Sequence, residues 1–379
     1  MALNTLPNEG LTSRGYPSDR IVTPIIINGD MSIAQRGTSS TGQTGGGYKT
    51  CDRWQNVQIF GTFTVSQSTD VPTGQGFVNS FKMDCTTANA SPSAGNTLHI
   101  SQRIEGQNLQ MLKKGTSSAE ATTLSFWVKS NKTGTYQVNL RDKDNTRIIG
   151  KTYTINSADT WEKKILNFAG DTTGAFGNDN GNSLEVEWFL GAGSTYTGGA
   201  VPTAWEAESA GDRAAGLTVN LADNTANEWY FTGVQLEVGE FDSTSIPSFP
   251  FESHENNLRK CQRYYYFLGG VNDTYKRVST NITNPNNRNQ TAGLHFLPVP
   301  MRDTPSVTIP AASSFTGVYI GGSNSYSSMS ISNQSEASSD ADFSVLRVTG
   351  TLSGNVGNHC VQVEMTYGST NKMEVSAEL

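Results

Sequence analysis

Apolar and polar side chains alternate along much of this chain, and this pattern constrains the fold more than any other feature of the sequence. In residues 124–129, Leu, Phe and Val alternate with Ser, Trp and Lys, and similar alternation occurs in 136–141, 185–190, 230–238 and 361–367. A period of two is typical of strands that bury one face and expose the other, as antiparallel sheets allow. Two such sheets packed face to face make a sandwich. The sequence therefore predicts an all-β protein of antiparallel β-sandwiches.

The composition agrees with this prediction and excludes several other classes of protein. Of the 379 residues, 16% are charged, 35% are hydrophobic and 38 are glycine, so neither disorder nor a helical bundle is expected. No apolar run approaches the roughly 18 residues of a membrane span, and residues 1–24 lack the basic start of a secretory signal. A net charge of −7 disfavours binding through phosphate neutralisation. We expect no membrane insertion and no nucleic-acid partner.

The cysteines do not form a recognisable framework. Cys51, Cys85, Cys261 and Cys360 are too few for a disulfide scaffold, and none stands in a C-x-x-C pair. A bridge between Cys51 and Cys85 requires neighbouring strands to hold both residues. Two buried, reduced thiols are the simpler interpretation.

A proline-containing segment divides the chain near residue 250. Residues 246–250 read Ile-Pro-Ser-Phe-Pro, an extended stretch that should end the preceding strand. A helix is predicted over 253–262, where Ser253 can cap the N-terminus and two basic residues suit the last turn. Short strands then resume at a spacing typical of a sandwich or a barrel. The predicted parts are an N-terminal segment (1–24), a sandwich domain (25–250), a linker helix with the start of a strand (251–268) and a second sandwich domain (269–379).

Several long motifs resemble one known family. Residues 26–38 read IINGDMSIAQRGT, 48–54 read YKTCDRW, 229–239 read WYFTGVQLEVG and 258–266 read LRKCQRYYY. Together they resemble a family of bacteriophage virion proteins, common in marine and cyanobacterial phages and described as tail-fibre or minor structural proteins. The similarity covers about residues 25–268, whose module in that family is akin to carbohydrate-binding jelly rolls. It implies that the first sandwich is jelly-roll-like, and we expect the same of the second.

The resemblance also implies a function. It points to a non-enzymatic virion protein, a tail fibre or appendage, that recognises a host-surface glycan or lipopolysaccharide. Residues 1–24 would attach to other virion proteins, and the chain would form a homotrimer. Residues 269–379 are less like the family and carry Ser-, Asn- and Gly-rich loops, so we expect them to include the receptor-binding part. Such a protein is assembled in the host cytoplasm and resides in the virion. A capsid decoration or head-fibre protein and a polysaccharide depolymerase remain as alternatives.

The same motifs contain residues that are best interpreted as framework. Trp54 and Trp161 are expected to fill the space between the sheets. Arg53, beside Asp52, is expected to make an ion pair or to cap a loop. One departure from the family is the longer, proline-containing stretch at residues 243–253.

No catalytic motif is evident in the sequence. The four histidines stand in no metal-binding or metalloprotease spacing, and there is no G-x-S-x-G elbow, Walker loop or dinucleotide fingerprint. The carboxylate pairs Asp142/Asp144 and Glu185/Glu187 have the i,i+2 spacing of one strand face, which any solvated strand can show. We therefore expect no catalytic residues and no cofactor.

One loop is rich in oxygen ligands. Asn178, Asp179 and Asn180, together with Asp171, are the residues that could hold a structural calcium ion, which favours carboxylate and amide oxygens. Their order does not match an EF-hand. Asn-Gly-rich loops also arise from turn chemistry alone, and this is the simpler interpretation.

Aromatic residues in polar, glycine-rich loops are the candidates for sugar recognition. A sugar ring stacks on an exposed aromatic side chain, and neighbouring amides bind its hydroxyl groups. Such loops contain Tyr196, Trp205, Tyr319, Asn324 and Tyr326. The alternative for each aromatic residue is a lid over the core or a subunit contact.

Overall fold

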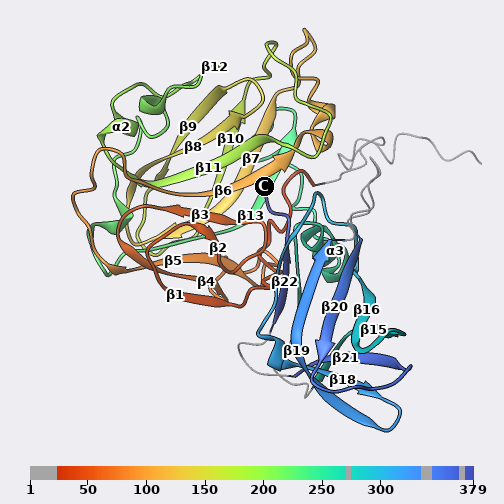
Figure 1. Cartoon of the computed structure of the whole chain (residues 1–379). Coiled ribbons are helices and arrows are strands. Elements are labelled where there is room, and N and C mark those ends of the chain that lie inside the picture. Colours follow the sequence, from red (N-terminus) through yellow and green to blue (C-terminus); the bar gives the residue numbers. More distant parts are fainter. Residues whose placement is uncertain (1–23, 270–274, 334–343, 367–371) are drawn as a thin grey trace, which may run out of the picture.

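The computed structural model describes residues 24–269, 275–333, 344–366 and 372–379, in which antiparallel strands are the main regular structure. They form a large β-sandwich followed by a small β-barrel, and the C-terminal end of the chain lies between the two (Figure 1). The predicted attachment segment, residues 1–24, lies outside the described residues apart from Pro24. Among the described residues, no helix is long and apolar enough to cross a membrane.

The sandwich consists of two antiparallel sheets, called sheet A and sheet B. In the described residues, sheet A has six strands in the order β1 (Ser39–Gln43), β4 (Thr62–Ser68), β5 (Ser80–Thr87), β13 (Glu228–Val238), β7 (Thr122–Ser130) and β10 (Glu162–Phe168). Sheet B has seven, in the order β12 (Glu206–Ala207), β9 (Arg147–Ile155), β8 (Gly134–Asp142), β11 (Asn182–Ala192), β6 (Thr97–Glu105), β3 (Gln55–Gln58) and β2 (Gly47–Tyr48). Helical turns lie in the connections: η1 (Gly106–Asn108), η2 (Gln110–Leu112), α2 (Ser194–Thr197), η3 (Ala210–Asp212) and η4 (Leu221–Asp223).

Aromatic rings fill the space between the sheets. Trp54, Trp188 and Phe231 are fully buried and meet edge to face, with ring centroids between 4.7 and 5.7 Å apart. Trp54 therefore has the predicted anchoring role. The same prediction is wrong for Trp161, which is half-buried and whose indole N–H donates to Asp70 (3.0 Å). Trp161 precedes β10 by one residue, at a position that alternation places on the outer face of sheet A.

The cysteines agree with the simpler of the two interpretations. Cys51, Cys85 and Cys261 are buried, Cys360 is exposed, and all four are unbridged. Burial raises the pKa of the Cys51 thiol well above its usual range. This keeps the thiol protonated and unreactive.

The predicted linker helix is confirmed. Helix α3 (His254–Gln262) begins after Ser253, whose side-chain oxygen accepts a hydrogen bond from the backbone N–H of Asn256 (3.3 Å). Glu255 lies in the first turn and two basic residues in the last, so the charges complement the helix dipole.

The second domain is antiparallel and all-β, as predicted, but it closes into a barrel. A three-stranded sheet, β14 (Tyr265–Leu268), β22 (Met373–Ser376) and β17 (Ser306–Thr308), leads into it. The barrel order is β15 (Tyr275–Asn284), β16 (Asn287–Phe296), β20 (Val345–Leu352), β19 (Gly322–Asn333), β18 (Phe315–Tyr319) and β21 (Cys360–Thr366), with η5 (Ala312–Ser314) before β18. Because β15 pairs with both β16 and β21, the sheet has no free edge. The open sandwich predicted for 269–379 is therefore corrected to a barrel, which the strand spacing also allowed.

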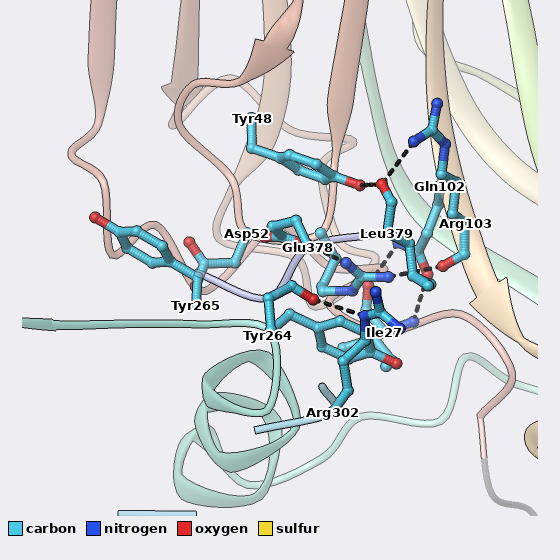
Figure 2. A network of polar contacts seen from close by, with 12 residues as sticks. Ile27, Tyr48, Asp52, Gln102, Arg103, Tyr264, Tyr265, Arg302, Glu378 and Leu379 are labelled. Atoms are coloured by element: carbon cyan, nitrogen blue, oxygen red, sulfur yellow. Dashed lines mark hydrogen bonds and ion pairs between the residues drawn. The ribbon is translucent and has the colours of Figure 1, made fainter. Parts of the chain in front are cut away.

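The end of the second domain packs against the first domain (Figure 2). The Arg53 guanidinium is buried, forms an ion pair with Glu378 and donates to the backbone carbonyl oxygen of Arg103 (2.7 Å). Arg103 and the Tyr48 hydroxyl both donate to the carbonyl oxygen of Leu379, at 2.6 and 3.3 Å. Arg53 thus makes an ion pair, but its partner lies 325 positions away along the chain.

A second group of contacts fixes the same boundary. The Glu105 carboxylate accepts two hydrogen bonds from Arg263 (2.9 and 2.8 Å) and one from the Tyr264 hydroxyl. Arg302 of the second domain also donates to the backbone carbonyl oxygen of Asn180 in the first domain (2.6 Å). Charged and polar groups from both domains therefore hold the two parts together.

Candidate functional site

The sugar-site candidates of the second domain lie on one hairpin but do not form one surface. Tyr319 is half-buried and stacks on His359, with ring centroids 6.2 Å apart, and the Asn324 amide donates to the Tyr319 hydroxyl (3.4 Å). Tyr326 is only 3% exposed, and its hydroxyl lies 3.0 Å from that of Thr291 inside the barrel. The prediction for Tyr326 is therefore corrected, because alternation along β19 turns this residue into the barrel core.

The two sugar-site candidates of the first domain, Tyr196 and Trp205, pack over buried residues. Tyr196 lies half-buried beside Phe189, with the Arg213 guanidinium 5.4 Å from the Tyr196 ring centroid. The Trp205 indole N–H donates to the carbonyl oxygen of Ala169 (2.7 Å), and its ring packs against the main core. Both aromatic residues thus fit the alternative of a lid better than that of an open sugar platform.

The segment that carries these two residues covers a charged face of sheet B. Glu185 and Glu187 are 3% and 0% exposed, although a solvated strand face was predicted for them. The Glu187 carboxylate forms ion pairs with Arg213 (2.6 Å) and Arg141 (3.4 Å), and Glu185 forms one with Arg141 (3.0 Å). The backbone of residues 212–216 bonds to this face through Gln137, which closes it off from solvent. Periodicity along one strand gives no information on which distant segment will cover that strand.

His99 lies on this buried face and predicts a dependence of stability on pH. Burial lowers the pKa of His99 to about 4, although its Nε2 lies 3.6 Å from a Glu187 oxygen. The unfolded chain has a pKa of about 6.5 at this residue, so it binds a proton between these values when the folded protein does not. The free energy of unfolding should therefore fall by about 2–3 kcal/mol as the pH drops from about 6.5 to 4.

The comparison of wild type with His99→Gln tests this prediction. Guanidinium unfolding at pH 7, 5.5 and 4 should give a smaller pH dependence for the variant, which cannot bind a proton at this position. If the free energy of unfolding depended equally on pH in the two proteins, the acid sensitivity would belong to other groups.

The calcium candidates do not gather around one point. The Asp171 carboxylate is occupied by Arg147 (2.7 Å) and Lys114 (3.0 Å). Asp179 accepts from the backbone N–H of Gly181 (2.8 Å), as in a turn, and the Asn180 amide donates to the second domain, to the carbonyl oxygen of Arg302. For Asn178 the structure gives no polar side-chain contact. Across the described ranges, no three or more His, Cys, Asp or Glu side chains group as metal ligands.

A groove on the outer face of sheet A has the features that the predicted sites lack. Its floor contains Trp127 and Ser125 from β7 and Gln235 from β13, and its volume is about 380 Å³. Ser125 and Gln235 are paired across the two strands, and Lys163 of β10 is paired with Trp127. Because all four point away from the core, the floor is polar with one half-buried indole ring. We call this feature the sheet A groove.

Three phenylalanines form the wall of the sheet A groove. Phe77, Phe249 and Phe251 lie with ring centroids 4.9–5.2 Å apart. The Gln235 amide group holds this wall in place by donating to the carbonyl oxygen of Pro247 (3.0 Å). A bulge in β13 at Gly233, which has φ +61°, accommodates Phe77, since a side chain at this glycine would clash with the Phe77 ring.

Two polar atoms at the floor have no partner. The Ser125 Oγ and the Gln235 Oε1 are buried, and neither forms a hydrogen bond with a described residue. Ser125 and Gln235 are 1% and 4% exposed. Buried polar atoms are usually hydrogen-bonded in folded proteins, so these two atoms are available to bond to a polar ligand or to water. The volume lies within the usual range for small-molecule sites.

Trp127 was missed by the sequence interpretation, which looked for aromatic residues in loops. A signal was present, because Trp127 stands between Ser125 and Lys129 on the polar face of an alternating strand. An aromatic side chain at such an outward position can offer a ring face to a ligand.

Comparisons with known proteins give only distant structural similarity. No family model matches this chain, and no curated protein matches it either. Similar solved structures include bacteriophage CBA120 tailspike protein 4 (enzymatically active domain; 14% identity, 57% of this chain and 21% of that chain, TM-score 0.30). Others are a putative sugar binding protein from Bacteroides thetaiotaomicron (12%, 57% and 100%, TM-score 0.32) and TmCBM61 in complex with β-1,4-galactotriose (8%, 57% and 99%, TM-score 0.28). The chain thus spans about a fifth of the tailspike structure.

Proposed function

We propose that this protein is a non-enzymatic virion structural protein, a tail fibre or appendage, that binds a host-surface glycan or lipopolysaccharide in the sheet A groove. The observation that carries the binding role is the half-buried Trp127 beside two unpartnered polar atoms, Ser125 Oγ and Gln235 Oε1. The virion role rests on the sequence resemblance of residues 25–268.

The chemistry of the groove suits a saccharide. The C–H face of a sugar ring is apolar and can stack on the Trp127 indole, while the sugar hydroxyls can bond to Ser125 and Gln235. A serine hydroxyl can donate or accept, and the glutamine oxygen accepts, so both fit a hydroxyl group. Among the described lining residues there is no His, Asp, Glu or Cys that could act as a nucleophile or base. This favours binding over catalysis.

The proposal assigns recognition to the first domain, whereas the loops of 269–379 led us to expect it in the second. The barrel keeps a lesser candidate surface at Tyr319 and Asn324, which are half-buried and joined to each other. Residues 1–24 are proposed as the attachment to other virion proteins, which places the protein in the virion after assembly in the host cytoplasm.

Binding of labelled protein to host cells tests the proposed function. Purified surface polysaccharide or lipopolysaccharide should compete with this binding, and the polymer should stay intact during long incubation. Loss of polymer length would support the depolymerase alternative. Antibody label on the capsid in electron micrographs would support the head-fibre alternative. Undiminished cell binding at saturating polymer would contradict glycan recognition.

We further propose that the chain assembles as a homotrimer through the barrel. Ile282, Leu294 and Phe296 lie on its outer face and are 66%, 42% and 69% exposed. Strand pairing extends this apolar strip to Val345, which is opposite Phe296. Exposed apolar strips of this kind favour association with another protein surface.

Phe296→Glu is expected to reduce the mass measured by light scattering from that of a trimer toward that of a monomer. The charge would have to be buried without a partner in the assembled state. Ile59→Glu, at a 56% exposed position on the sandwich, is the matched control and should leave the mass unchanged. A wild-type protein that is monomeric at all concentrations would refute the trimer.

A further inference from the structure

Lys163 is the charged residue of the sheet A groove, and it has no counter-ion. Its strand position is directly opposite Trp127, and its side chain lines the groove. No carboxylate among the described residues lies within ion-pair distance of Lys163. The residues that line the groove include no Asp or Glu. A cation thus stands beside the indole ring without a neutralising group.

The other lysines of the same sheet face differ in this respect. Lys82 pairs with Glu228 (2.6 Å), and Lys129 pairs with Asp70. Both also lie over the Tyr230 ring, at 5.3 and 4.4 Å from its centroid. Among the described lysines on this face of the sheet A strands, Lys163 is therefore the one without a carboxylate partner.

Partial burial makes the unpaired state of Lys163 unfavourable. The surrounding protein lowers the pKa of Lys163, since desolvation opposes its charged form and no carboxylate compensates. Its side chain nevertheless remains exposed to solvent. A bound anion would supply the missing compensation and could reach Lys163 from the open side of the groove.

We propose that the sheet A groove selects a saccharide that carries an anionic group, a carboxylate or a phosphate, and that Lys163 binds this group. The inference rests on the proposed function and adds the class of ligand. The sugar ring lies on Trp127, its hydroxyls meet Ser125 and Gln235, and its charged substituent extends over the ring edge to Lys163. Residues directly opposite each other on neighbouring strands have Cβ atoms about 5 Å apart, so the flexible lysine side chain can reach the substituent of a stacked ring.

The experiment compares an acidic sugar with its neutral ester and with a phosphorylated sugar. Titration calorimetry with the full chain would use digalacturonic acid, its neutral methyl ester and galactose 6-phosphate. The acid should bind about threefold to tenfold more tightly than the ester, the range expected of a charge-assisted contact at a partly exposed site. The phosphate sugar distinguishes a site that accepts either anion from one that requires a carboxylate.

Substitution separates the anion contact from the stacking contact. Lys163→Met keeps most of the apolar stem and should remove the preference for the acid while leaving the affinity for the ester unchanged. Lys143→Met, at an exposed and unpaired lysine in the turn after β8, is the control and should keep the preference. Thermal unfolding of each variant checks that the domain remains folded.

The outcomes separate the two proposals. Equal binding of acid and ester by a groove that requires Trp127 would overturn the anionic ligand and leave glycan binding intact. An acid preference that survives Lys163→Met would also overturn this inference. Failure of all three sugars and of host polysaccharide to bind would overturn both proposals.

Discussion

Replacement of Arg53 by methionine is expected to lower the free energy of unfolding by about 3–5 kcal/mol. The guanidinium is 1% exposed and meets Glu378, which is 8% exposed. Removal of one partner leaves the other charge buried with less compensation, and this costs more than the intact pair contributes. Arg36 also reaches Glu378 (3.2 Å), which places the expected cost toward the lower end of the range.

The ring contacts of Arg53 add to this expected loss. The Arg53 guanidinium carbon lies 3.4 Å from the ring centroid of Tyr264, and a guanidinium stacked on an aromatic face is stabilising. Arg53→Lys should therefore restore only part of the stability, since lysine keeps the charge but not the planar, multiply bonded group. Because Tyr264 belongs to the linker and Glu378 to the second domain, the loss should appear at the domain boundary.

The distribution of tryptophan allows the two domains to be followed separately. All six tryptophans precede residue 250, so their fluorescence follows the sandwich, while circular dichroism follows both domains. In wild type the two signals should change together with guanidinium, and in Arg53→Met the circular dichroism should change at a lower concentration. Lys113→Met, which breaks an exposed ion pair with Glu120, should cost less than about 1 kcal/mol. Coincident, unshifted transitions in Arg53→Met would contradict a coupling role for this residue.

Local sequence patterns were sufficient to predict several elements of this fold. Alternation in 124–129 and 230–238 correctly indicated β7 and β13, because the side-chain period of a strand is a local property. The helix after Ser253 was predicted for the same reason, since capping and charge act within one turn. Barrel closure was not predictable in this way, because it depends on pairing between β15 and β21, which are about 80 residues apart.

The sheet A groove illustrates the same limit at a site. Trp127 and Ser125 were visible as outward residues of one strand. The Phe77 and Phe249 wall comes from two distant segments, and no pattern in the sequence indicates that these segments meet over β7. The departure from the resembled family, residues 243–253, contributes one side of this wall and is thus the part for which family similarity is least informative.

Replacement of Trp127 by alanine is expected to weaken glycan binding by about 30-fold or more. A central aromatic anchor typically contributes at least about 2 kcal/mol, and about 1.4 kcal/mol corresponds to a factor of ten in affinity. Trp127 is the aromatic side chain on the polar floor of the groove, so its loss removes the stacking surface while Ser125 and Gln235 remain. Trp127→Phe should retain part of the affinity, because the smaller ring still offers an apolar face.

Trp161→Ala provides a control on the same sheet face. Trp161 is also half-buried, but it bonds to Asp70 and does not line the groove, so its removal should leave the affinity within about twofold of wild type. Calorimetric titration with host polysaccharide measures both variants, and thermal unfolding shows whether either one is destabilised. A folded Trp127→Ala protein with wild-type affinity would exclude the sheet A groove as the binding site. Recognition would then have to occur elsewhere, with the Tyr319–Asn324 surface of the barrel as the next place to test.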